Sequence, residues 1–402
     1  MKITDVRLRT LVGVDNGPGR IYDNKKVVRV APTDIHPEYR RQKGHISVTH
    51  VPQPDGTCRI TQTFLEIGTD EGITGVVGPI SNPMPPVYIL TYLKPILLGQ
   101  DPWDTERLWD IMYRSCINGR KGENMQAISY VDCALWDIRA KACGLPVWKL
   151  LGGRVQRRIR AYANTAGYPQ EPEQIAAAVR ELKAQGFTAI KWGVSYGPAA
   201  GEAGMKKTVD TVRLLRETAG DDMMLMLDAW SSWDVPYTLR IAPRLAEYDL
   251  AWIEEPVMAD LTDSYAYLNA RCPVPISGGE HEYTRWGFKT LLDADACALY
   301  QPDPAWSGGI SEVQRILGLI SAYDRKASIH NSLPGLGAAM SCAHPSSVVP
   351  IAEYLMLVGE ASQYFLKTPC RPENGWFTPL EVPGLGLDID ETKVTESFYI
   401  QI

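Results

Sequence analysis

From about residue 160 onward, the chain alternates short apolar runs with longer amphipathic stretches. The apolar runs are RAYANT, TAIKWG, MMLMLDAW, LAWIEEP, VPISGGE, CALYQPD and KASIHNS. Strands that alternate with helices in this way predict parallel pairing through right-handed crossovers. Their number and regular spacing favour an α/β fold built as a (β/α)8-type barrel, a modified TIM barrel.

An open, doubly wound sheet is the main alternative for such a pattern. That fold needs fewer strands and usually carries a glycine-rich phosphate turn after its first strand. No G-x-G-x-x-G motif opens a predicted helix, and no G-x-x-x-x-G-K-[ST] motif occurs in the chain. The barrel is therefore the predicted architecture.

The first 150 residues follow a different, α+β pattern. Alternating polar and apolar residues predict strands near 2–14 and 61–70, and helical periodicity runs from about 86 to 152. In NMQAISYVDCALWDIRAKACG, one stripe of a predicted helix carries Ile128, Val131, Ala134, Leu135 and Ile138. Gly144 and Pro146 are expected to end this helix.

Composition narrows the class of protein. The 402 residues are 45% apolar, which is enough for a large core, and the mixed charges sum to −6. Nucleic-acid partners are not expected, because they require concentrated positive faces, so we expect a small-molecule partner. The eight cysteines are never closer than ten residues, which favours reduced thiols and a cytoplasmic location. Neither a signal peptide nor an apolar run of membrane-spanning length is recognisable, so no membrane partner is expected.

Chemically capable side chains follow the last five apolar runs. They are Asp228, Glu254, Glu280, Asp303 and His330, at intervals of 26, 26, 23 and 27 residues. Each interval is about one β/α unit. Because the carboxyl ends of barrel strands meet at one mouth, where active sites form, these side chains should lie together.

The carboxylates of Asp228, Glu254 and Glu280 suit one hard divalent cation that keeps open positions for water and substrate, and Mg²⁺ is the expected ion. Each acid taken alone is more typical of a helix cap or a surface residue. Three of them in register make that interpretation weaker.

Asp303 and His330 follow the next two runs. A buried aspartate bonded to an imidazole fixes its tautomer and makes it a better proton acceptor, so His330 is the expected general base. A histidine in ASIHNS is otherwise an ordinary packing residue. Lys191, on the second barrel strand, either covers the surface or points inward as an acid, a base or an electrostatic clamp.

Several motifs together resemble the mandelate racemase branch of the enolase superfamily. They are MLDAW, WIEEP, GGEHE, QPDPAW followed by SGG, a late strand that ends in histidine, and the helix ALWDIRAKACGLPVWKLLGG. Within that branch, GGEHEYTR, QPDPAWSGG and IAEYLM are most similar to acid-sugar dehydratases of the L-rhamnonate group. The resemblance spans nearly the whole chain. It implies Mg²⁺-dependent α-proton abstraction, an enediolate intermediate and dehydration to a 2-keto-3-deoxy acid.

The resemblance also assigns roles to single residues. Asp228, Glu254 and Glu280 would hold Mg²⁺, and His330, oriented by Asp303, would remove the proton. Glu353 of IAEYLM resembles a substrate-contacting acid, and His281 resembles an active-site histidine. His36 and Arg59 look like substrate-contacting residues of the cap.

The resemblance implies a capping domain over residues 1–150, a catalytic barrel over 151–375, and a C-terminal segment, 376–402, that packs back on the cap. Residues 17–60 carry eight Lys or Arg against four acids, as expected of a lid that attracts an anionic sugar acid. A plain solvated loop is the alternative. A homo-oligomer is expected by analogy alone.

Two other functions stay open. The same site can support racemisation, epimerisation or cycloisomerisation, although racemases of this branch tend to carry K-x-K where this chain has Ala189-Ile190-Lys191. The stretch after His330, NSLPGLGAAM, differs from the serine-rich turn of rhamnonate dehydratases. A catalytically inactive barrel with a binding role is the third possibility.

Overall fold

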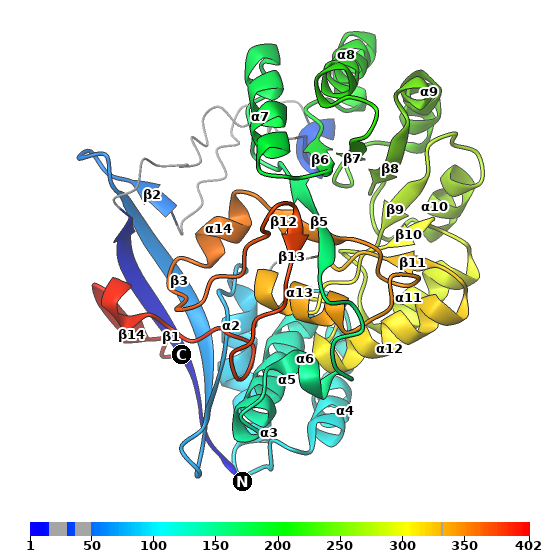
Figure 1. Ribbon diagram of the computed structural model, residues 1–402. Coiled ribbons are helices and arrows are strands. Elements are labelled where there is room, and N and C mark those ends of the chain that lie inside the picture. The colour runs from blue at the N-terminus through cyan, green and yellow to red at the C-terminus, as the bar shows by residue number, and fades with distance from the viewer. Residues whose placement is uncertain (16–29, 37–49, 331–332) are drawn as a thin grey trace.

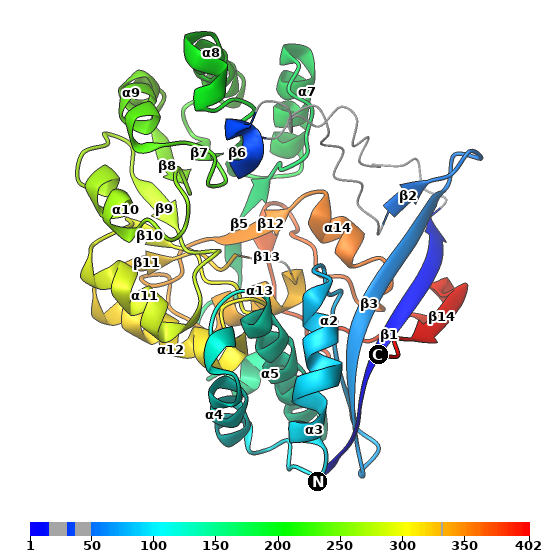
Figure 2. The ribbon, with the colours of Figure 1, turned by 180° about the vertical axis from the view of Figure 1, so that it is seen from behind.

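The structure, a computed structural model, describes residues 1–15, 30–36, 50–330 and 333–402. A ring of parallel strands surrounded by helices forms one part of the molecule, and an antiparallel sheet with its own helices forms the other (Figures 1 and 2). None of the described helices is long and apolar enough to cross a membrane.

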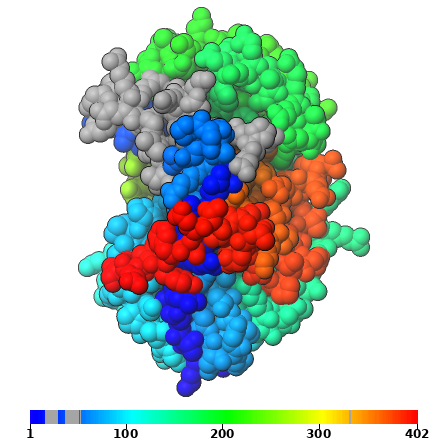
Figure 3. All heavy atoms as spheres, turned by 90° about the vertical axis from the view of Figure 1, so that its left-hand side faces the viewer, coloured from blue at the N-terminus to red at the C-terminus, as the bar shows by residue number. Residues whose placement is uncertain are grey.

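The antiparallel sheet has two long strands at its centre, β1 (Ile3–Asp15) and β3 (Cys58–Thr69). The predicted strands near 2–14 and 61–70 correspond to them. β2 (His50–Pro52) and β4 (Thr74–Val77) both pair with β3. The other edge is formed by β14 (Glu396–Tyr399), so the end of the chain lies across its beginning (Figure 3).

The helices of this part lie mostly between the antiparallel sheet and the ring of strands (Figure 2). Their bounds are α2 (Met84–Tyr88), η2 (Ile89–Leu93), α3 (Lys94–Leu97), α4 (Thr105–Ser115), η3 (Ile117–Gly119), α5 (Glu123–Ala142) and α6 (Val147–Leu150). Nearly all of α5 is buried, not only the predicted stripe, because it packs against β4 and also against α12. A helix enclosed on all sides has little need for a polar face.

The parallel strands appear in chain order around the ring. They are β5 (Ile159–Asn164), β6 (Ala189–Gly193), β7 (Met224–Asp228), β8 (Leu250–Glu254), β9 (Ile276–Gly278), β10 (Leu299–Tyr300), β11 (Lys326–Ala327) and β12 (Ala352–Leu355). Each pairs with the next from β5 to β11, and β12 pairs back with β5. Among the described residues, no strand pairing joins β11 to β12. A single hydrogen bond from Ala327 N to Val348 O, 2.8 Å long, lies near that opening.

An α-helix follows each of these strands, and the helices lie around the outside of the ring (Figure 1). They are α7 (Pro172–Ala184), α8 (Gly201–Ala219), α9 (Val235–Leu245), α10 (Thr262–Asn269), α11 (Thr284–Asp293), α12 (Gly309–Ala322), α13 (Pro334–Cys342) and α14 (Val358–Ser362). Short 3₁₀ turns and a further strand complete the fold: η1 (Pro32–Ile35), η4 (Pro198–Ala200), η5 (Ala246–Tyr248), β13 (Trp376–Phe377) and η6 (Glu391–Lys393).

The inside of the ring is closed by its own side chains. Tyr162, Ala189, Met226, Trp252, Leu299 and Ile351, each from or beside a different strand, form a buried cluster separate from the main core. Such layers make a parallel barrel a packed core rather than a pore. Polar chemistry is thereby confined to the strand ends.

The two parts of the molecule are joined by buried polar contacts. Asp132 of α5 accepts hydrogen bonds from Ser311 N (2.9 Å) and Ser311 Oγ (2.7 Å) of α12. Gly309 adopts φ +86° at this joint, and a Cβ there would lie 2.3 Å from the Asp132 carboxylate. Glycine is required because only it combines this φ with so close an approach.

Candidate active site

Three predicted carboxylates gather at the carboxyl ends of neighbouring strands. Asp228 and Glu254 are the last residues of β7 and β8 and face each other in register. Glu280 follows β9 by two residues, past Gly279. Gly279 has φ +111°, and a Cβ there would press against Phe288 at 3.1 Å. The side chains of all three acids are buried.

Lys191 lies inside this group and is completely buried, so the interpretation as a surface lysine is wrong. Its ammonium contacts Glu254 Oε1, lies 2.7 Å from Glu353 Oε1 and lies 4.0 Å from Asp228 Oδ2. Burial alone would lower the pKa of Lys191, but the carboxylates of Glu254 and Glu353 raise it well above its usual value. Lys191 therefore remains a cation that holds these acids together.

The carboxylate of Glu353, on β12, has a separate environment at each oxygen. Oε1 accepts from Asn164 Nδ2 at 2.8 Å as well as from Lys191, and Oε2 lies 3.6 Å from His330 Nε2. Burial would raise the pKa of Glu353, but Lys191 and His330 lower it to about 2. Glu353 thus carries a negative charge between two cationic groups.

His330 and Asp303 form the predicted pair. His330 Nδ1 lies 2.7 Å from Asp303 Oδ2, and Asp303 Oδ1 accepts from Ala305 N at 2.6 Å. The other ring nitrogen, Nε2, lies 3.5 Å from Glu280 Oε2. Burial lowers the pKa of His330, but Glu280, Glu353 and Asp303 together raise it to about 10.

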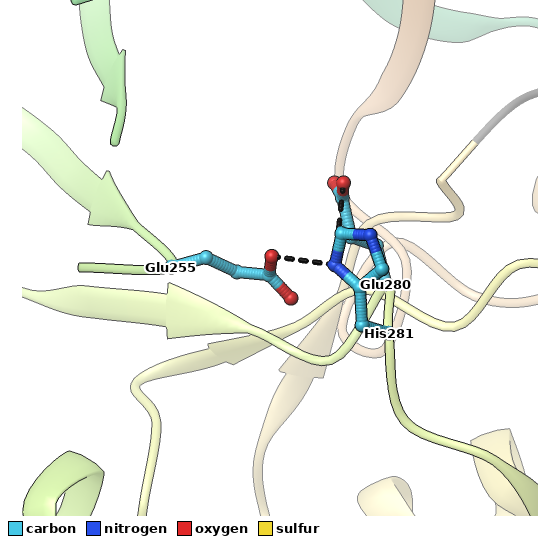
Figure 4. A group of neighbouring side chains, drawn as sticks. All are labelled: Glu255, Glu280 and His281. Carbon is cyan, nitrogen blue, oxygen red and sulfur yellow. Dashed lines mark hydrogen bonds and ion pairs between the residues drawn. The ribbon is translucent and has the colours of Figure 1, made fainter. Parts of the chain in front are cut away.

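Glu255 and His281 form a second carboxylate and imidazole pair next to Glu280 (Figure 4). His281 Nδ1 lies 2.7 Å from Glu255 Oε2 and 3.7 Å from Glu280 Oε1. Burial lowers the pKa of His281, but the Glu255 carboxylate raises it to about 9. Glu255 did not figure among the predicted site residues. The second glutamate of WIEEP was its only sequence signal.

The arrangement of oxygen donors fits a hard divalent cation. Glu255, Glu280 and His281 bring ligand atoms within 4.8 Å of one another, closer than the predicted group of Asp228, Glu254 and Glu280 in the described part of the chain. Glu280 belongs to both groups. Both groups also have bonds within the protein, because Glu255 bonds to His281 and Glu254 bonds to Lys191. The predicted group of Asp228, Glu254 and Glu280 differs in offering only carboxylate oxygens, the ligands that Mg²⁺-type ions prefer. The chemistry of the donors therefore favours the predicted group.

The two predicted cap residues lie on β3 and directly after η1. Arg59 is half-exposed on β3, with its guanidinium 3.9 Å from Glu396 of β14. His36 is exposed and follows η1 directly. That segment is docked beside the barrel, because Val30 N donates to Val194 O at 3.0 Å. Most of the predicted lid lies outside the described residues, namely 17–29 and 37–49 of its span 17–60.

Most of the chain matches known protein families. Residues 47–152 match the family described as "Mandelate racemase / muconate lactonizing enzyme, N-terminal domain", and residues 174–393 match "Enolase C-terminal domain-like". A D-galactonate dehydratase from Klebsiella pneumoniae (strain 342) is 34% identical over 350 residues, which cover 83% of this chain and 90% of that protein.

Solved structures are similar over almost the full length. L-rhamnonate dehydratase from Gibberella zeae has a TM-score of 0.82 at 28% identity, covering 98% of this chain and 94% of that one. A second structure of that enzyme is complexed with Mg, with a TM-score of 0.80, 27% identity and coverages of 98% and 95%. The 3,6-anhydro-D-galactonate cycloisomerase from Zobellia galactanivorans has a TM-score of 0.76 at 27% identity, with coverages of 98% and 100%.

Proposed function

Because the chain belongs to the mandelate racemase and muconate lactonizing enzyme family of the enolase superfamily, we propose that it is a Mg²⁺-dependent hydro-lyase that dehydrates a sugar acid. The substrate is an aldonic acid such as L-rhamnonate, and the product is its 2-keto-3-deoxy acid. The names of the D-galactonate and L-rhamnonate dehydratases support this class of substrate. The observation that carries the proposal is the His330–Asp303 pair, whose second ring nitrogen faces a cluster of buried carboxylates.

Asp228, Glu254 and Glu280 would hold the cation. When bound, Mg²⁺ supplies Lewis-acid stabilisation of the negative charge that develops on the substrate carboxylate, worth several kcal/mol. Glu254 is preset for this role, because Trp252 Nε1 and Gln301 Nε2 donate to its Oε2 at 3.1 Å and 2.7 Å. Hydrogen bonds of this kind from neighbouring side chains fix the orientation of a side chain that binds a metal.

His330 accepts the proton next to the substrate carboxylate. Its Nδ1–H donates to Asp303, so Nε2 is the nitrogen that faces the site and accepts the proton when the ring is neutral. The carboxylates around Nε2 hold the ring in its protonated form when no other cation balances them. A cation held by Glu280 would weaken that field and would favour the neutral imidazole, the form of His330 that can accept a proton.

Departure of the β-hydroxyl needs a proton donor. Lys191 is poorly suited, because its ammonium is bound between Glu254 and Glu353 and its pKa is raised well above the usual value. His281, paired with Glu255 and adjacent to Glu280, is the proposed donor. His330 can also return its own proton if the elimination is syn.

Cycloisomerisation or epimerisation of a related acid is the second candidate. The similarity to a 3,6-anhydro-D-galactonate cycloisomerase supports this second candidate. Both candidates share proton removal by His330 and differ in the fate of the intermediate. A two-base racemisation is less compatible with the structure, because Lys191 is held as a cation.

A substrate screen tests the proposal. The purified protein is incubated with Mg²⁺ and a library of aldonic and aldaric acids, and 2-keto acid formation is followed by its semicarbazone absorbance. We expect at least one aldonic acid to give keto acid, with activity lost in EDTA and restored by Mg²⁺. If a sugar acid is consumed but no keto acid forms, the reaction is an isomerisation and not a dehydration. If no acid in the library is bound or turned over, the proposed reaction is wrong and a catalytically inactive barrel with another binding role is the remaining possibility.

A further inference from the structure

Trp306 is held rigidly beside the proposed base. It lies in the turn after β10 that also carries Asp303, and Trp306 N donates to Asp303 O at 3.0 Å. The next residue closes the turn, since Ser307 N donates to Asp303 O at 2.7 Å and Ser307 Oγ donates to Glu282 O at 3.0 Å. The backbone that orients the His330 partner therefore also fixes the position of the indole.

The indole ring covers both active-site imidazoles. Its centroid lies 4.9 Å from that of His330, at an interplanar angle of 42°, and 5.8 Å from that of His281, at 35°. These separations are typical of aromatic contact. One ring thus contacts the imidazoles of both pairs, whose residues follow the ends of the strands β8 to β11.

The Nε1–H group of Trp306 is buried and has no acceptor among the described residues. Other tryptophans of the chain use this group. Acceptors are present for Trp109, Trp136, Trp148, Trp192, Trp233 and Trp252. A buried donor without a partner is costly, and a ligand bound beside it can supply the missing acceptor.

We propose that Trp306 is a substrate-binding residue whose indole N–H donates to a hydroxyl oxygen of the bound sugar acid. This inference rests on the proposed function, because His330 and His281 are there assigned to the reacting carbons. A ring that contacts both imidazoles lies alongside those carbons, so its donor reaches a hydroxyl on the neighbouring part of the chain. The same ring keeps both imidazoles from turning away from the substrate.

The variant Trp306→Phe separates the donor from the ring. Phenylalanine keeps an aromatic wall against His330 and His281 but lacks the N–H. We expect kcat/KM for the best acid from the screen to fall about three- to tenfold, mostly through KM, as for loss of one hydrogen bond to a neutral group. Trp306→Leu removes the wall as well and is expected to lower kcat further.

Deoxy analogues of that acid identify the acceptor. Each analogue lacks one hydroxyl beyond the reacting carbons. For one of them, wild type and Trp306→Phe should have the same kcat/KM, because the hydrogen bond is absent from both. Trp148→Phe is the matched control, since it removes a donor bonded to Leu380 O far from the site, and it should treat all acids like wild type. An equal loss for every analogue, or no loss at all, would overturn the proposal.

A spectroscopic test works without turnover. In ¹⁵N-labelled protein with Mg²⁺, the indole resonance of Trp306 is assigned by its absence from Trp306→Phe. Adding D-gluconate, or the best acid from the screen, should shift that resonance as the N–H gains an acceptor. Binding shown by calorimetry with an unmoved Trp306 resonance would contradict the inference, whatever reaction the protein catalyses. A shift together with no keto acid would contradict only the proposed reaction.

Discussion

Glu255 Oε2 lies 2.7 Å from His281 Nδ1, the same separation that joins Asp303 Oδ2 to His330 Nδ1. In both pairs the carboxylate binds one ring nitrogen, and the other ring nitrogen can accept or donate a proton. The two imidazoles stand on adjacent sides of Glu280, which lies 3.7 Å from one and 3.5 Å from the other. The site therefore holds two oriented proton carriers, as an elimination that moves two protons requires.

Glu255→Gln should separate the two proton transfers. The amide keeps the shape of the side chain but removes the negative charge that favours protonated His281. We expect keto acid formation to fall about 10- to 100-fold, as part of a general-acid contribution is lost. Exchange of the α-proton with solvent deuterium should continue, because His330 and Asp303 are intact.

The measurement is NMR of substrate deuteration beside the keto acid assay. Glu247→Gln, the same change at an exposed position of η5, serves as the control and should behave like wild type. Equal losses of exchange and dehydration would show that Glu255 supports the first step instead.

His330→Asn should abolish exchange of the α-proton. Asparagine still bonds to Asp303 but offers no basic nitrogen, so neither exchange nor dehydration proceeds. Incubation of the substrate in D₂O with Mg²⁺, followed by proton NMR, checks this. His344→Asn, a histidine bonded to Met340 O outside the site, should keep both activities. Persistent exchange in the first variant would transfer the role of base to Lys191.

Glu254→Gln should weaken the metal site without unfolding the protein. Loss of a carboxylate ligand removes much of the stabilisation supplied by the cation, several kcal/mol, which is on the order of a thousandfold in rate. Lys191 keeps Glu353 as a partner, so its charge is not left unpaired. Calorimetric titration with Mg²⁺ should show weaker binding alongside an unchanged circular dichroism spectrum. Normal Mg²⁺ affinity would transfer the ion to the group of Glu255, Glu280 and His281.

Asp132 should make stability depend on pH at the joint between the two parts. Burial raises its pKa to about 7, whereas an unfolded aspartate titrates near 4. The folded state therefore binds more protons between these values, and the free energy of unfolding falls as pH rises from about 4 to about 7. One proton gives a slope of at most about 1.4 kcal/mol per pH unit.

Asp132→Asn removes this dependence. Urea unfolding at pH 5 and pH 8 measures the free energy of unfolding of both proteins. The value for wild type minus that for the variant should be larger at pH 5 than at pH 8. Asp260→Asn, at an exposed position, corrects for general effects of the substitution. The same difference at both pH values would mean that Asp132 is ionised throughout.

The strand ends were predictable because each depends on local pattern alone. An apolar run followed by an acid places Asp228 and Glu254 at the ends of β7 and β8, and a parallel register brings them together. Glu255 could not be found this way, since side chains alternate along a strand and the neighbour of an inward residue should face outward. The chain instead turns at Glu255, where φ is +38°, and its side chain returns to the mouth.

Other features depend on contacts between distant segments. The burial of Lys191 is set by Glu254 and Glu353, which lie 63 and 162 residues further along the chain, so no local pattern distinguished it from a surface lysine. The roles of His36 and Arg59 stay predictions. The assignments of the metal ligands, of the general base and of the domain boundaries also await experiment.

The opening between β11 and β12 has a mechanical consequence. His330 follows one lip of this seam and Glu353 lies on the other, with Nε2 and Oε2 3.6 Å apart across it. We expect thermal fluctuations to separate β11 from β12 more readily than β7 from β8, because fewer backbone hydrogen bonds join the first pair of strands. His330 thus follows a strand that, within the described part of the chain, has no ladder on one side, whereas Asp228 and Glu254 end two strands that are paired along their length.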